Sequence, residues 1–162
     1  PSIIQLDDIL PGDRGTVSFT VEADKRNTDA SDTVTPTLGL NLTETAENGL
    51  NDPEREAGDT TESVGELQEH LYVNVWKNTG ILGFDALGAD DLTQQITEST
   101  IAEGTLAQVA EDLDDEPLGS IDATSDGDSV SVTLRWEFID SDSVNETQTG
   151  SVTFDLNIDC QQ

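Results

Sequence analysis

The stretch "SVSVTLRWEF", residues 129–138, alternates apolar and polar side chains without a break. Strict alternation of this kind is typical of a β-strand with one face on a core and the other toward solvent. It predicts a half-buried strand with Trp136 on its core side, because Trp136 shares the parity of Val132, Leu134 and Phe138.

The same period of two recurs along the chain and predicts an all-β fold. Each matching segment has at least three apolar residues at alternate positions, and the segments are 16–22, 37–43, 71–77 and 151–159. A shorter extended segment, 2–6, precedes a Pro-Gly turn. Several short strands with turn residues between them favour a β-sandwich.

One segment predicts a helix. Thr100 and Glu103 have the spacing of a capping box, and Ala102, Leu106 and Val109 follow at helical intervals. We therefore expect one amphipathic helix at about 100–113, with a shorter helical turn within 90–97. The acidic stretches 44–66 and 112–128 are expected to be connections. One domain is expected, with residues 1–10 as an N-terminal segment and 11–162 as the body.

The charge is strongly unbalanced, with 35 Asp and Glu against 6 Lys and Arg and a formal net charge of −29. Low hydrophobicity with high charge is also typical of disorder, but the strand alternation argues against it here. A folded protein with this charge is destabilised by self-repulsion in dilute buffer. At about 1 M salt the Debye length falls to roughly 3 Å, so the composition indicates a protein of an extreme halophile.

The charge and hydropathy exclude several partners. The sequence has no basic patch, which argues against nucleic-acid binding. It has no apolar run near the ~20 residues that span a bilayer, so no membrane span is expected. The chain starts at Pro1, and we expect a processed, secreted protein located outside the cell or on its surface.

Candidate catalytic residues are few, and no enzymatic activity is expected. The chain has one histidine, His70, which we expect at the solvent edge of a strand, and one cysteine, Cys160. Cys160 continues the apolar series 152–158, which predicts a buried thiol; an intersubunit disulfide is the alternative.

Short motifs suggest a calcium site and two glycosylation sites. Asp122, Asp126 and Asp128 surround a Gly turn and resemble part of a calcium loop, but the spacing and closing Glu of such a loop are missing. Turn chemistry is the favoured interpretation, with Ca²⁺ as the alternative. Asn145 and Asn41 each begin an N-glycosylation sequon, and Asn145 is the better candidate because a hairpin-like connection is expected there.

Tyr72 and Trp76 form a further candidate site. They lie opposite Val73 and Val75 in the alternation of 71–77 and would form an aromatic strip on one sheet face. Such a strip could bind glycans; a sheet buried on both faces explains the pattern equally well.

The two ends of the chain resemble a known family. "LDDILPGDRGTVSFTVEA" at 6–23 and "LRWEFIDSDSVNETQTGSVTFDLNIDCQQ" at 134–162 are similar to segments of secreted halophilic archaeal proteins with SipW-type signal peptides. These proteins look like relatives of the TasA/camelysin family. The resemblance implies a jelly-roll-like sandwich with helical insertions, secreted and assembled into extracellular fibres or pili with roles in adhesion or biofilm. It also implies that an N-terminal strand of one subunit completes a sheet of its neighbour.

Residues 2–6 have the properties of such a donor strand. The segment comprises Ser2, Ile3, Ile4, Gln5 and Leu6. Folding back onto its own sheet is one alternative, and pairing in trans with a second copy is the other. Head-to-tail exchange does not close, so it produces filaments, with Pro11 and Gly12 as the hinge. The competing hypothesis is a monomeric glycan-binding module that uses Tyr72 and Trp76.

Overall fold

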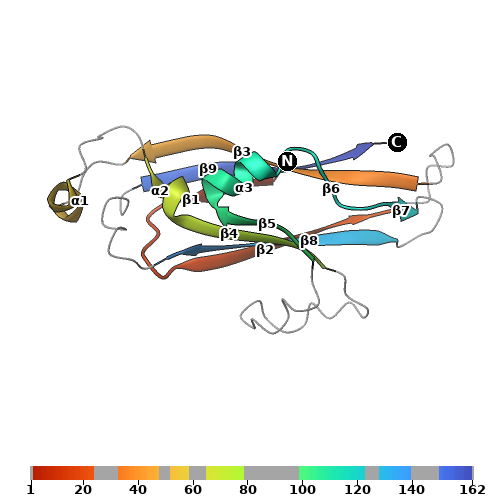
Figure 1. The fold of residues 1–162 in the computed structure, drawn as a ribbon, viewed down its shortest axis with the longest axis horizontal. Coiled ribbons are helices and arrows are strands. Elements are labelled where there is room, and N and C mark those ends of the chain that lie inside the picture. The colour runs from red at the N-terminus through yellow and green to blue at the C-terminus, as the bar shows by residue number, and fades with distance from the viewer. Residues whose placement is uncertain are drawn as a thin grey trace.

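The computed structural model describes residues 2–23, 33–47, 52–58, 65–78, 99–122, 128–139 and 150–161. Within these ranges the chain forms two antiparallel sheets stacked as a sandwich (Figure 1). The helical turn expected at 90–97, Asp126 and Asn145 lie outside the described residues.

The first sheet, called sheet A here, has the strand order β1-β9-β3-β6, and β7 also pairs with β3. Its strands are β1 (Ser2–Leu6), β9 (Gly150–Gln161), β3 (Thr33–Glu47), β6 (Glu116–Pro117) and β7 (Ile121–Asp122). Sheet B has the order β2-β8-β4-β5. Its strands are β2 (Arg14–Glu22), β8 (Ser129–Phe138), β4 (Leu71–Asn78) and β5 (Ser99–Thr105).

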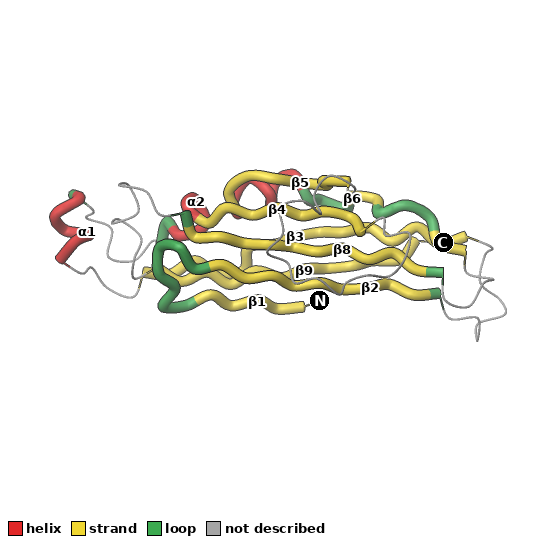
Figure 2. The backbone as a smooth tube through the Cα atoms, turned by 90° about the horizontal axis from the view of Figure 1, so that it is seen from below, coloured by secondary structure: helices red, strands yellow, loops and turns green. Residues whose placement is uncertain are grey.

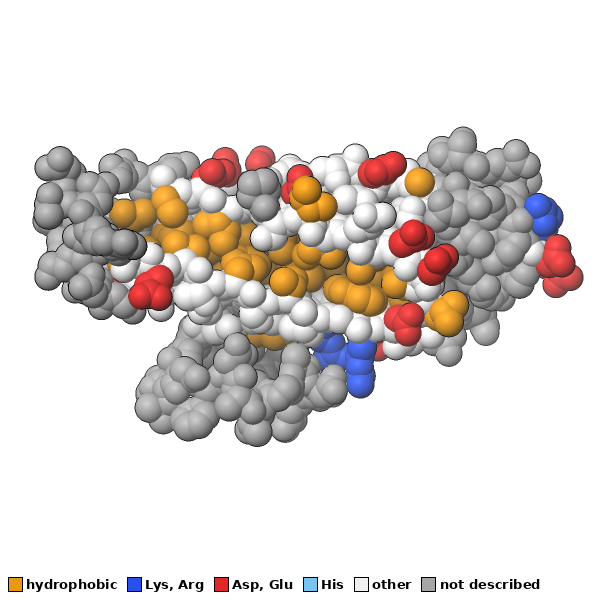
Figure 3. All heavy atoms as spheres, turned by 180° about the vertical axis from the view of Figure 1, so that it is seen from behind, with side chains coloured by type: hydrophobic (Ala, Val, Ile, Leu, Met, Phe, Trp, Pro, Cys, Tyr) orange, Lys and Arg blue, Asp and Glu red, His pale blue; other side chains and the backbone are white. Residues whose placement is uncertain are grey.

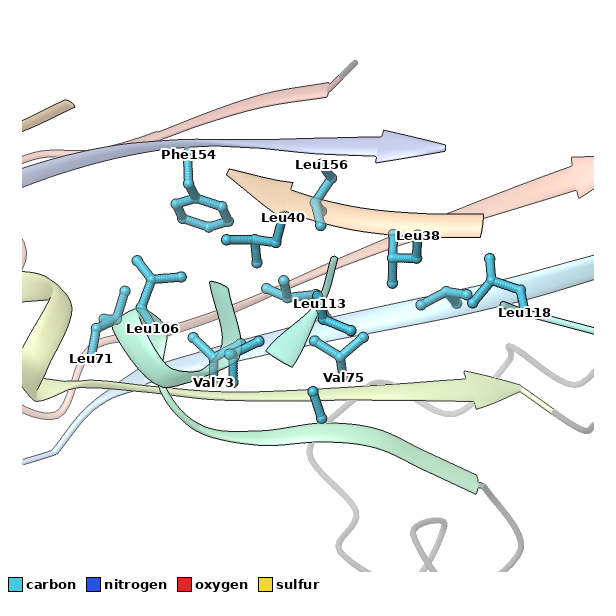
Figure 4. Close-up of a cluster of buried hydrophobic side chains, with 14 of the residues drawn as sticks. Leu38, Leu40, Leu71, Val73, Val75, Leu106, Leu113, Leu118, Phe154 and Leu156 are labelled. Carbon is cyan, nitrogen blue, oxygen red and sulfur yellow. The ribbon is translucent and has the colours of Figure 1, made fainter. Parts of the chain in front are cut away.

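The all-β fold with minor helix predicted from the alternation is confirmed. All five alternating segments are strands, and their apolar faces meet between the sheets (Figure 4). Sheet A contributes Leu38, Leu40 and Phe154, which point toward Val73 and Val75 of sheet B. Burying a large aliphatic or aromatic side chain stabilises a fold by about 1.5–3 kcal/mol, so this shared core defines the two-layer arrangement.

The helix predicted at 100–113 is wrong in its first half. Residues 99–105 form β5, which pairs with β4, and only α3 (Leu106–Asp112) is helical. The capping box is formed by Thr105 and Gln108: Gln108 N donates to Thr105 Oγ1 at 3.3 Å, and Thr105 N donates to Gln108 Oε1 at 3.0 Å. Pairing with β4 outweighs local helix preference here, and Gly104, which is unfavourable within a helix, lies in the strand.

Two short helices close one side of the sandwich. α2 (Leu67–His70) and α3 lie over the side where β4 and β5 face β3 (Figure 1). Leu67, Leu106 and Val109 are fully buried there, and Leu40 N donates to the Leu113 carbonyl at 3.1 Å. The remaining helix, α1 (Asp52–Ala57), follows β3 at one end of the molecule. Helices therefore cover one side of the sandwich, while in the described part of the chain the opposite side is bordered by the edge strands β1 and β2.

Candidate functional site

The candidate donor strand β1 lies at the edge of sheet A. It pairs antiparallel with β9 of its own chain, from Ser2 opposite Leu156 to Leu6 opposite Val152. Only Leu6 is buried; Ile4 is partly buried against the core, and Ile3 is 71% exposed. In this single chain the segment thus has the folded-back arrangement, held by one strand ladder and few apolar contacts.

β1 covers only part of the edge that β9 presents. β9 runs from Gly150 to Gln161, whereas its pairing with β1 ends at Leu156. Figure 2 shows β1 stopping near the middle of the molecule while β2 and β9 continue. Among the described strands, none pairs with β9 on this side beyond Leu156.

β2 is the edge strand of sheet B, and it lies on the same side of the sandwich as β1, the edge strand of sheet A. The side chains of β2 that point toward the core are only partly buried, although they alternate as core residues do. Figure 3 shows apolar side chains exposed in a long stripe on this side of the molecule. We call this surface the open seam and define it by partly buried residues of β1, β2 and β9: Ile4, Val17, Phe19, Val21 and Ile158.

The connection between β1 and β2 contains the predicted hinge, and its C-terminal part is hydrogen-bonded to β8. Gly12, with φ +92°, donates its N–H to the Phe138 carbonyl at 2.7 Å, and Phe138 N donates to the Asp13 carbonyl at 2.8 Å. The turn at Pro11 and Gly12, predicted as the hinge, is thereby tied to β8. Asp8 has φ +53°, a conformation that costs a non-glycine residue free energy, so release of β1 would require rotation upstream of that turn.

The aromatic strip predicted on β4 faces away from the core. Tyr72 and Trp76 are partly buried on the outer face of sheet B, opposite in parity to Val73 and Val75. The Tyr72 hydroxyl donates to Glu103 Oε1. Asn74, between the two aromatics, is 6% exposed, and its Oδ1 has no partner among the described residues.

Burial and the neighbouring carboxylate change the titration of Tyr72. Desolvation first, and then the hydrogen bond and negative charge of Glu103, raise the pKa of Tyr72 to about 12. The phenol therefore stays protonated and continues to donate to Glu103 at all physiological pH values.

The acidic turn before β8 is organised by Asp128. Its Oδ2 accepts from Asp122 N at 2.6 Å, and its Oδ1 accepts from Ser129 N at 3.0 Å. Both carboxylate oxygens of Asp128 thus accept hydrogen bonds from backbone N–H groups. No cluster of three or more potential metal-ligating side chains occurs within the described ranges.

The remaining candidate residues are spread over the fold. Cys160 is exposed, so the buried thiol predicted from the alternation is wrong: β9 at this point has run past the core. His70 ends α2 and is partly buried. Asn41 is exposed in the middle of β3 and stands opposite Asp155.

No protein-family model matches the chain, and no curated protein matches it either. Among the described residues there is no helix with the length and apolar character needed to cross a bilayer.

Proposed function

We propose that this protein is a non-enzymatic structural subunit of an extracellular filament that polymerises head to tail by donor-strand exchange through Ser2–Leu6. The observation that carries the proposal is the position of β1, an edge strand hydrogen-bonded to β9 alone among the described strands. In a filament, β1 of a neighbouring copy takes this place on β9. The resemblance of both chain ends to TasA/camelysin-like proteins supports the same assembly.

Once β1 leaves β9 of its own chain, pairing β9 with β1 of a second copy is more favourable than leaving the edge of β9 unpaired. A second copy's β1 would restore the same ladder from Val152 to Leu156 and refill the position of Leu6. Each exchange would therefore conserve these contacts. Asp8, in the short connection of the folded-back chain, has a left-handed backbone conformation that costs free energy. Strain in a short hinge is a known driver of strand swapping. Since each subunit carries a net charge of −29, filament growth is expected to require high salt or divalent cations.

A disulfide between β1 and β9 tests the exchange directly. Gln5 and Thr153 are cross-strand partners, at a spacing that suits a disulfide. We expect the variant Gln5→Cys/Thr153→Cys, in a Cys160→Ser background, to form no filaments when oxidised and to form them after reduction. The readout is electron microscopy in about 3 M salt, where charge repulsion is screened.

The matched control places the same bond where no exchange is proposed. Thr20 and Ser131 are partners between β2 and β8, and their hydroxyls lie 2.6 Å apart. The oxidised Thr20→Cys/Ser131→Cys variant should polymerise as the unmodified chain does. Filaments from the oxidised β1–β9 variant would reject donor-strand exchange.

A second candidate function is glycan binding on the outer face of sheet B. It is favoured by Asn74, whose buried Oδ1 is unpartnered among the described residues between Tyr72 and Trp76. Aromatic faces with adjacent amides and carboxylates suit sugar rings. Under this alternative, Trp76→Ala abolishes retention on immobilised glycans, whereas the oxidised β1–β9 variant keeps it.

A further inference from the structure

β2 is the edge strand of sheet B, and its own sequence has none of the usual features that prevent pairing with another strand. Among the described strands, β2 pairs only with β8, over an unbroken register from Arg14–Glu137 to Glu22–Ser129. Natural sheets protect such edges with charges, proline, bulges or short strands. β2 has nine residues, no proline and no bulge, and its only charges are at its two ends.

Two backbone hydrogen bonds at the ends of β2 show which of its residues face this edge. Ala23 N donates to the Asp128 carbonyl at 2.7 Å, and Phe138 N donates to the Asp13 carbonyl at 2.8 Å. Because backbone groups in an antiparallel pair alternate in direction, the odd-numbered residues of β2 bond β8. The even-numbered residues therefore direct their N–H and C=O groups outward, and they are Arg14, Thr16, Ser18, Thr20 and Glu22.

We propose that β2 pairs antiparallel with β2 of a second copy, about a two-fold axis at Ser18, and joins two B sheets into one. In this register Ser18 lies opposite Ser18 of the second copy, and Thr16 lies opposite Thr20 of the second copy. All outward-facing residues then fall in hydrogen-bonded pairs, each exchanging two backbone bonds. A two-fold axis makes the interface self-complementary and closed.

The charges select this register. It places Arg14 opposite Glu22 of the second copy at each end of the paired strands. A shift of two residues would remove both oppositely charged pairs and shorten the ladder. Two chains that each have 6 Lys and Arg residues and a net charge of −29 repel each other. The two Arg14–Glu22 pairs offset part of this repulsion at the interface.

The apolar face of β2 fits the same arrangement. Val17 would lie beside Phe19 of the second copy on the core side of the strand, and both are only partly buried in one copy. Cross-strand pairs of aromatic and β-branched residues stabilise antiparallel ladders. On the outer face, hydroxyl pairs already link β2 to β8: Ser18 to Thr133 at 2.8 Å and Thr20 to Ser131 at 2.6 Å.

This interface uses no residue of β1, so it is independent of donor-strand exchange. The first experiment therefore uses the full chain with β1 locked by the oxidised Gln5–Thr153 disulfide described above. Sedimentation equilibrium in about 3 M salt should give twice the 17.4 kDa chain mass. Ser18→Pro should give a monomer, because proline removes an outward-facing N–H without removing a backbone bond to β8. Ser18→Pro and Ser18→Ala both lose the hydroxyl bond to Thr133, so the difference between them isolates the N–H.

The control is Ser18→Ala, which keeps the backbone N–H and should remain dimeric. Circular dichroism establishes that each variant keeps its strands. A monomeric locked chain would overturn the proposal, and so would a Ser18→Pro variant that remains folded and dimeric. If Ser18→Pro loses its fold, the variants Arg14→Glu and Glu22→Arg test the interface instead.

Charge exchange tests the register. Arg14→Glu and Glu22→Arg should each raise the dissociation constant about three- to thirty-fold, since like charges then face each other at both ends of the ladder. The double variant should return to within about twofold of the starting value. Arg14 and Glu22 are eight residues apart in one strand, about 27 Å, so such rescue requires two molecules.

These measurements belong at the lowest salt at which circular dichroism still shows the folded chain, because salt screens the pairs. A double variant whose loss equals the sum of the two single losses would overturn the proposed register.

Discussion

A Cβ atom on Gly15 would lie 2.6 Å from the indole ring of Trp136. The two residues are cross-strand partners in β2 and β8, and the indole lies against the Gly15 backbone in place of a side chain. Trp136 is thus accommodated at the border of the open seam because its neighbour has no Cβ.

We expect Gly15→Ala to destabilise the fold by about 1–3 kcal/mol, because real Cβ contacts are not this short and the indole must leave its position. The measurement is thermal unfolding in high salt. Thr16→Ala is the matched control, since Thr16 is exposed on the outer face of the same strand. Equal unfolding temperatures for the two variants would show that Trp136 has room to move.

Tyr72 should report the state of the outer face of sheet B, because it is the only tyrosine in the chain. Its pKa of about 12 in the folded protein exceeds the usual value near 10. Because the pKa of Tyr72 is higher in the folded protein than in the unfolded chain, the protonated phenol contributes to the free energy of unfolding. This contribution is present in full below about pH 10 and is lost as the pH rises through about 12.

An ultraviolet titration of phenolate absorbance measures this pKa directly. Glu103→Gln should move it toward the ordinary value, because the negative charge and part of the hydrogen-bonding effect are removed. Tyr72→Phe should remove the corresponding pH dependence of unfolding. An unchanged pKa in Glu103→Gln would show that desolvation alone raises it.

Thr105 should contribute to stability as the N-cap of α3. Its Oγ1 accepts from Gln108 N, and its own N–H is bonded by the Gln108 side chain. Thr105→Ala should cost about 1 kcal/mol of unfolding free energy, whereas Thr105→Ser should cost much less because it keeps the acceptor. Denaturant unfolding of the two variants measures the difference; equal losses would contradict a capping role.

The sequence predicted the strands well because alternation with a period of two arises directly from burial of one sheet face. Val130 to Phe138 is such a case, and it became β8 with its apolar face in the core. Thr100 to Thr105 was predicted incorrectly because its apolar spacing also fits a helix, and only the position beside β4 selects the strand. Local patterns have no information about such long-range pairing.

The candidate surface was harder to predict for a related reason. Val17, Phe19 and Val21 have the alternation of fully buried residues, yet they line the open seam because β2 is an edge strand. Cys160 followed the same parity and is exposed because β9 extends past the core. Strand order and strand length beyond the core both depend on the assembled sheets. The interior of β2, between Arg14 and Glu22, has no charged residue, and this is the feature of the sequence that agrees with a position at a sheet edge open to pairing with a second copy.

Leu6 and Ile3 form a matched pair for testing what holds β1 in place. Both are large aliphatic residues of the same five-residue strand, but Leu6 is 8% exposed and Ile3 is 71% exposed. Leu6→Ala should weaken docking of β1 on β9 by about 2–3 kcal/mol, whereas Ile3→Ala should change it by less than about 0.5 kcal/mol.

If donor-strand exchange assembles the filament, the critical concentration for assembly follows the same order, because the donor strand occupies the same site in trans. Light scattering across a concentration series in high salt measures it. Equal effects of the two substitutions would mean that β1 docks with a different face in the assembly than in the single chain.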